Sequence, residues 1–125
     1  MKIRVDPNAR TPVSEQLRAR IAARIASGRP APGERLPPVR TLAAELGLAT
    51  NTVAKAYREL ESAGFLVGRG RLGTFVAEVL PPLPGDAEAM LDEAARAFAR
   101  RAAQLGVPPD RALAFAERAL RLPSP

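Results

Sequence analysis

The chain has 125 residues, of which 46% are hydrophobic and none is cysteine or histidine. A chain of this length forms one compact domain or a small domain with an appendage, which excludes a multidomain enzyme. Because the chain has no cysteine or histidine, it lacks disulfides, thiolate and imidazole metal ligands and the nucleophilic chemistry that depends on these residues, and we expect no enzymatic activity, no catalytic residues, no metal site and no cofactor.

The net charge of +6 is confined to the front of the chain. Residues 1–78 carry 13 basic and 7 acidic side chains, whereas residues 79–125 carry 6 of each. A uniform solubilising charge would be spread over both parts. The asymmetry therefore predicts a basic front module that binds a polyanion and a neutral rear segment with another task, although a simple composition bias is the alternative.

No stretch of the sequence resembles a membrane span or a signal peptide. The longest uncharged run, residues 46–54, is about half as long as the roughly 18 apolar residues that a span requires. The first ten residues carry charges where a signal peptide needs an apolar run. We expect a cytoplasmic protein that makes no membrane contact.

The first part of the chain predicts a strand, a helix and a loop. Residues 2–6 alternate apolar and polar side chains, as in a short strand. Thr11 is the expected N-cap, and Pro12 the first residue, of a helix over residues 12–27. Residues 28–36 contain two prolines and two glycines and predict a loop. The apolar side of the helix consists of Val13, Leu17, Ile21 and Ile25.

Two further helices and a hairpin complete the front module. A short helix is expected over residues 38–46 and ends at Gly47 in a left-handed turn, and a third helix covers residues 50–63. Residues 65–67 and 74–77 predict two short strands joined by a glycine-rich turn. Three helices followed by a hairpin indicate a winged helix-turn-helix, a mainly α fold with a small β-hairpin.

The rear of the chain predicts a two-helix extension. Three prolines within residues 79–85 indicate a stiff linker, so the expected domains are residues 1–78, the linker, and a helical tail over residues 86–125. Asp86 is the expected cap of a first tail helix that stops at Gly106, and a second helix is expected over residues 109–122. The apolar band of the tail is too small to be stable alone and should pack on a second copy. Its expected dimer contacts are Leu91, Phe98, Leu105, Leu113 and Leu120.

The second helix of a helix-turn-helix enters the major groove of DNA, while the first braces it. Thr50, Asn51 and Thr52 begin that second helix and can reach base edges or phosphates, with Asn51 as the best candidate for reading a base. Helix capping by Thr50 or Asn51 is the structural alternative. Arg40, on the brace helix, and Lys55 suit phosphate contacts, and the alternatives are a surface salt bridge for Arg40 and simple solvation for Lys55.

The turn of the hairpin adds a second basic element. Arg69 and Arg71 flank Gly70, and glycine permits close approach to a sugar-phosphate backbone or to the minor groove. The alternative is a hairpin that uses glycine for its turn and arginine for solubility.

The motifs resemble the GntR family of bacterial transcription regulators. The resemblance runs from Pro12 to Val76 and rests on PVSEQL, PGERLPPVRTLAAELGL, TNTVAKAYRELESAGFL and GRGRLGTFVA, in that order. The rear segment, which contains RAAQLGVPPDRALAFAERAL, resembles the YtrA subfamily, whose members carry a small two-helix dimerisation tail. The family often has Ser and Arg where this chain has Ala49 and Thr50, and Ser in place of Pro38.

The resemblance implies that Arg40, residues 50–52 and the turn around Gly70 and Arg71 contact operator DNA. We therefore expect a nucleoid-associated repressor that binds a two-fold symmetric operator as a homodimer. A winged-helix module that binds another protein instead of DNA is the alternative. The Ala-rich tail shows no polar cluster that would orient a small-molecule effector.

Overall fold

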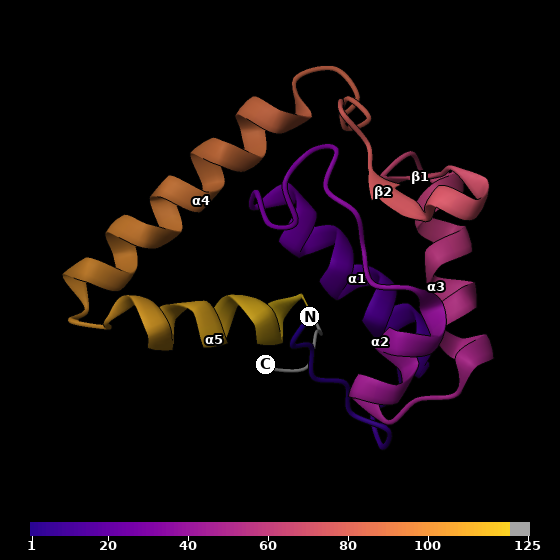
Figure 1. Cartoon of the computed structure of the whole chain (residues 1–125). Helices are drawn as coiled ribbons and strands as arrows, with labels where there is room; N and C mark the ends of the chain where they lie inside the picture. Colours follow the sequence, from indigo (N-terminus) through magenta and orange to yellow (C-terminus); the bar gives the residue numbers. More distant parts are fainter. Residues whose placement is uncertain (121–125) are drawn as a thin grey trace. The chain divides into compact units, whose positions relative to one another are not determined.

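The computed structural model describes residues 1–120, which form two units: residues 1–81 and a segment that begins at Pro82. The first unit contains helices α1 (Val13–Ala26), α2 (Val39–Leu46) and α3 (Thr50–Ser62), strands β1 (Leu66–Gly68) and β2 (Thr74–Val76), and a 3-10 turn, η1 (Gly70–Leu72), between the strands. The second contains α4 (Ala87–Gln104) and α5 (Pro109–Ala119) (Figure 1). The mainly helical fold with a small antiparallel hairpin is thus confirmed.

The core of the first unit lies where α1 and α2 pack against α3. Each helix contributes the apolar side that its periodicity predicts, and burial of one such aliphatic side chain is worth about 1.5–3 kcal/mol. The short hairpin adds Leu66 and Val76, which face each other across the two strands and are both buried. The most deeply buried apolar side chains of the helices are Leu17, Ile21, Leu42, Val53, Ala56 and Leu60.

Two local predictions at the front of the chain are wrong. Residues 2–6 form no strand; the alternation instead reflects burial of Ile3 in the helical core, which requires no neighbouring strand. Thr11 does not cap α1, because Pro12 is the N-cap residue and no side chain caps this helix. Pro12 keeps an extended backbone, so the helix begins one residue later than expected and its free N–H groups are one residue farther from the Thr11 hydroxyl.

A buried glutamine holds the chain that precedes α1. The side chain of Gln16 is fully buried and accepts a hydrogen bond from the Asp6 backbone N–H at 2.7 Å. Its amide nitrogen donates to the carbonyl oxygens of Asp6 at 2.8 Å and Thr11 at 2.7 Å. One side chain therefore satisfies three backbone groups of a loop that has no regular structure of its own.

The second unit consists of two helices joined by a turn. Asp86 occupies the N-cap position of α4 but makes no side-chain capping bond. Helix α5 ends at Ala119 with Leu120 as its C-cap residue; positions 121 and 122 of the predicted helix lie outside the described residues. None of the described helices is both long and apolar enough to cross a membrane.

We predict that Gln16→Met lowers the free energy of unfolding by about 2 kcal/mol, because the apolar side chain fills a similar volume but leaves three backbone groups without their partner. Urea denaturation followed by circular dichroism measures the change. Glu15→Met, at the exposed neighbouring position, is the matched control and should have little effect. Equal stability of both variants would show that water replaces the glutamine at no cost.

Candidate nucleic-acid interface

The start of α3 carries polar side chains that make no capping hydrogen bond to the helix. Ala49 is the N-cap residue of α3, and no side chain caps the helix. The capping alternative for Thr50 and Asn51 is therefore not realised; both side chains are exposed, and Thr52 is half-buried. The backbone N–H groups of the first turn add a partial positive charge to this end of the helix.

The position of α3 follows from the burial of its opposite side. Val53, Ala56 and Tyr57 face the core, which turns Lys55, one helical turn after Asn51, towards solvent. The turn before α3 is made possible by Gly47, whose φ of 67° lies in the left-handed region that glycine tolerates best. The residues predicted to enter a DNA groove thus lie together at one helix start, where Thr50 and Asn51 are exposed.

Arg40 is exposed on the first turn of α2, and Tyr57 fixes the chain that leads into this helix. The Tyr57 hydroxyl donates a hydrogen bond of 2.7 Å to the carbonyl oxygen of Pro37, just before the N-cap residue Pro38. Burial, and secondarily the carboxylate of Glu45, raises the pKa of this hydroxyl, so it remains a donor at neutral pH. Tyr57 therefore links the start of α2 to α3.

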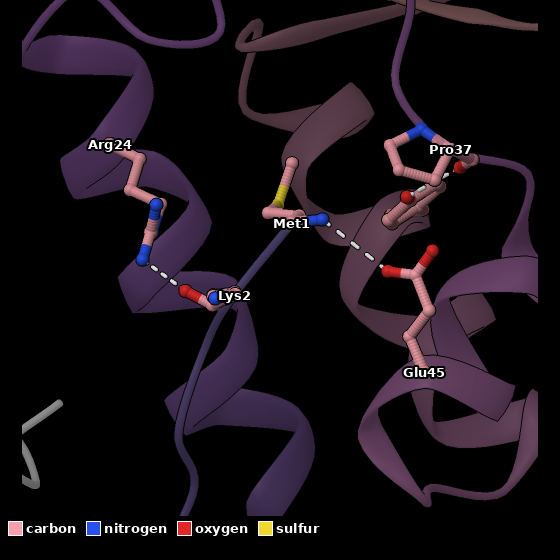
Figure 2. A network of polar contacts seen from close by, with 6 residues as sticks. Met1, Lys2, Arg24, Pro37 and Glu45 are labelled. Carbon is pink, nitrogen blue, oxygen red and sulfur yellow. Dashed lines mark hydrogen bonds and ion pairs between the residues drawn. The ribbon is translucent and has the colours of Figure 1, made fainter.

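Polar contacts attach the chain terminus to α1 and α2 (Figure 2). The amino group of Met1 lies 3.3 Å from the carboxylate of Glu45 on α2, and the guanidinium of Arg24 on α1 donates to the carbonyl oxygen of Lys2. Figure 2 shows the Met1–Glu45 contact near Pro37, whose carbonyl accepts the tyrosine bond, and the Arg24–Lys2 contact on the other side of the view. Residues 1–3 therefore lie along α1 and α2 without pairing as a strand.

The hairpin carries the second predicted basic element. Strands β1 and β2 pair with Leu66 opposite Val76 and Gly68 opposite Thr74, and η1 places Gly70 and Arg71 at the tip. The guanidinium of Arg69 lies over the Phe75 ring, 5.3 Å from its centroid, which orients this cation on the hairpin. Arg69 and Arg71 are both exposed.

Arg35 joins the hairpin and was missed in the sequence. The backbone of Arg35 forms an isolated antiparallel β-bridge with Phe75 on the free edge of β2. Two hydrogen bonds of 2.8 Å hold this bridge: the Leu36 N–H donates to the Thr74 carbonyl, and the Val76 N–H donates to the Glu34 carbonyl. The Arg35 side chain lies against Gly73, where an added Cβ would be 2.7 Å from its Nε. The sequence offered only an arginine in a loop, because this pairing joins segments about 40 residues apart.

The cations of the candidate site, on α2, α3, the hairpin and the strand-like segment at Arg35, form no ion pair within the part of the chain that the structure describes. The ion pairs there join Met1 to Glu45, Arg18 to Glu15 and Glu59, and Arg96 to Asp92. The salt bridge considered for Arg40 is therefore not formed. Free guanidinium groups around glycine-rich backbone are suited to phosphate, which accepts hydrogen bonds from arginine in bidentate fashion. The free cations are Arg35, Arg40, Lys55, Arg69 and Arg71.

Comparison with known proteins gives consistent results. The sequence model of the bacterial regulatory proteins of the gntR family matches residues 13–76. The HTH-type transcriptional regulator Rv1152 of Mycobacterium tuberculosis is 44% identical to this chain over 105 residues, which cover 84% of this chain and 83% of that protein.

Two solved structures extend the comparison. YtrA from Sulfolobus acidocaldarius, a GntR-family transcription factor, is 31% identical with a TM-score of 0.56 and covers 95% of this chain and 97% of its own. The DNA-binding domain of AraR in complex with operator ORE1 is 27% identical with a TM-score of 0.53, over 62% of this chain and 94% of that one.

We predict that Tyr57→Phe lowers the free energy of unfolding by about 1 kcal/mol, because the Pro37 carbonyl loses its donor while the ring remains packed. Chemical denaturation measures this change. Asn51→Ala, which removes an exposed side chain from the same helix, should leave stability within about 0.5 kcal/mol of the parent. A tyrosine variant as stable as the parent would mean that this bond does not secure the start of α2.

Proposed function

The chain belongs to the GntR family of DNA-binding transcription regulators, a family of regulators and not of enzymes, and from this premise we propose that it represses transcription as a homodimer on a two-fold symmetric operator. The observation that carries the DNA-binding site is the exposed, uncapped start of α3 beside a set of unpaired cations. The experiment is the selection of bound DNA from a random pool, followed by a footprint that reports half-site, spacing and symmetry.

Within this proposal, each group of residues has a distinct role. Thr50, Asn51 and Thr52 enter the major groove, where the Asn51 amide can pair with an adenine edge. Arg40 and Lys55 contact phosphates on the groove walls. Arg69, Gly70 and Arg71 meet the backbone or the minor groove with the hairpin tip, and Arg35 extends that contact from its place against Gly73.

A homodimer is supported by energetics and by the exposed apolar side chains of the tail. One small module reads few base pairs, whereas useful regulation requires about 4–10 kcal/mol of preference over non-specific DNA, so two half-sites must be read together. The apolar tail residues predicted to make the dimer contact are between 43% and 70% exposed in the single chain: Leu91, Phe98, Leu105, Leu113 and Leu120. Such a row of exposed large side chains is typical of an interface.

Repression is the simplest consequence of operator binding. A dimer that occupies promoter DNA excludes RNA polymerase without any further contact, whereas activation requires a surface that recruits the polymerase. Among the described residues, the cations of the candidate site lie on the front unit and the exposed apolar side chains lie mainly on the tail, and DNA and a second copy account for both. A promoter fusion whose output rises when the gene is deleted would support this direction of control.

We predict that Arg40→Gln, Arg71→Gln and Arg35→Gln each weaken binding to every DNA sequence and flatten the plot of log affinity against log salt by about one unit of slope. Asn51→Ala should cost about 1–3 kcal/mol on the preferred operator and relax the preference at one base position. Fluorescence anisotropy at several salt concentrations measures both effects. Arg111→Gln, an exposed arginine of α5, is the matched control. Unchanged DNA affinities in the three arginine variants of the front unit and in Asn51→Ala would favour a module that binds protein instead of DNA.

We predict that Phe98→Asp converts the dimer to a monomer and lowers operator affinity at least about tenfold, because the second half-site is no longer read. Sedimentation velocity measures the assembly state. Ala97→Asp places the same charge on α4 off the apolar stripe and should leave the dimer intact. A parent chain that sediments as a monomer at micromolar concentration would refute the dimer and leave the DNA-binding site in place.

A further inference from the structure

Charges are completely segregated along α4. Its acidic side chains, Glu88, Asp92 and Glu93, all lie in the N-terminal half, and its basic side chains, Arg96, Arg100 and Arg101, all lie in the C-terminal half. Only one ion pair joins the two groups within the described chain, at 3.0 Å between Arg96 Nε and Asp92 Oδ2. The other four charges are exposed and have no partner in the described residues.

The apolar stripe of α4 is symmetric about the same point. Leu91 and Phe98 lie on one side of the helix, at equal distances in sequence from the pair Ala94 and Ala95. Ala87 and Ala102 lie at equal distances farther out on that side. A second α4 that runs in the opposite direction would therefore form two equivalent contacts, each between Leu91 of one copy and Phe98 of the other.

The N-terminal half of this stripe has no cover within its own unit. Helices α4 and α5 diverge from their turn (Figure 1), and the cavities between them, of about 240 and 380 Å³, are lined by residues from Phe98 onwards. Met90 and Leu91 are 68% and 63% exposed. Large apolar side chains exposed to this extent favour a partner that packs along the helix.

We propose that the second copy of this chain packs antiparallel along α4, so that the acidic half of each helix faces the basic half of the other. This inference rests on the proposed homodimer and adds its orientation. Glu88 and Arg101 flank the Leu91/Phe98 stripe, whereas Glu93, Arg96 and Arg100 lie on the opposite side of the helix. A parallel pair would place Glu88 at the level of Glu88 and Arg101 at the level of Arg101 of the other copy. The antiparallel pair instead places Glu88 at the level of Arg101 and opposes the two helix dipoles.

A competing explanation is that each helix complements only its own dipole, since acidic residues near an N-terminus and basic residues near a C-terminus stabilise a single helix. That explanation predicts no orientation for a second copy. It also does not account for the equal spacing of Leu91 and Phe98 from the centre of the helix. Orientation is therefore the property to measure.

The absence of cysteine from the chain permits a direct test by single-cysteine cross-linking. In the antiparallel pair, Ala95→Cys lies at the centre and forms a disulfide with its own copy under mild oxidation. Residues 87 of the two copies lie about 22 Å apart along the axis, well beyond the roughly 7 Å between Cα atoms that a disulfide spans. Ala87→Cys alone should therefore remain uncross-linked, but should cross-link when mixed with Ala102→Cys.

Each cross-linking outcome decides the orientation. Central and mixed disulfides without an 87–87 disulfide support the antiparallel pair. An 87–87 disulfide overturns it in favour of a parallel pair and leaves the dimer standing. A dimer by sedimentation in which none of these cysteines reacts overturns α4 as the contact, and a monomer overturns the dimer and its orientation together. Operator binding by the uncross-linked variants is measured in parallel and reports separately on the DNA-binding site.

Charge reversal gives a second measurement that does not depend on cysteine geometry. Glu88→Arg should raise the dimer dissociation constant about threefold to tenfold, because the new cation lies at the level of Arg101 of the other copy. Arg101→Glu in the same chain should restore the dissociation constant, since opposite charges then meet again. A parallel pair predicts no such rescue. Circular dichroism confirms that each variant keeps its helices, and loss of the dimer in the rescued variant with helices intact overturns the proposal.

Discussion

The burial of one side of α3 between α1 and α2 is the constraint from which the functional surface follows. Val53, Ala56 and Tyr57 occupy that side, so the remaining side of the helix is exposed. Because helix geometry is regular, burial of these apolar residues leaves Asn51 and Lys55 on the exposed side. The packing that stabilises the fold therefore also determines which side chains are available for the proposed DNA contact, and the bond from Tyr57 to Pro37 secures the start of α2 beside them.

Periodicity and turn chemistry predicted the helices and the hairpin, because both are local properties of the sequence. The bonds made by Gln16, Tyr57 and Arg35 could not be predicted in this way, since each joins segments that only the folded chain brings together. The predicted strand over residues 2–6 was wrong for the same reason. Alternation indicates burial of every second residue, and the neighbour that buries it is a helix here.

In the candidate site too, the local features could be predicted from the sequence and the long-range contacts could not. The start of α3 and the arginines of the hairpin tip were recognisable from motif spacing, whereas the absence of capping bonds and acidic partners is a property of the structure. Arg35 shows the difference most clearly. Its sequence neighbours indicate a loop, and only strand pairing with Phe75 brings it to the glycines of the hairpin.

The orientation of the tail helices has a consequence for how operator symmetry is met. Two antiparallel copies of α4 are related by a two-fold axis perpendicular to the helices, whereas a parallel pair has its axis along them. A dimer on a palindromic operator must share its axis with the DNA. In the proposed arrangement α4 therefore lies across the dyad of the operator, and the charge pattern of one tail helix decides how two DNA-reading units are presented to two half-sites. Because joint binding of the half-sites depends on their effective concentration, the proposed orientation would contribute to operator affinity without any contact to a base.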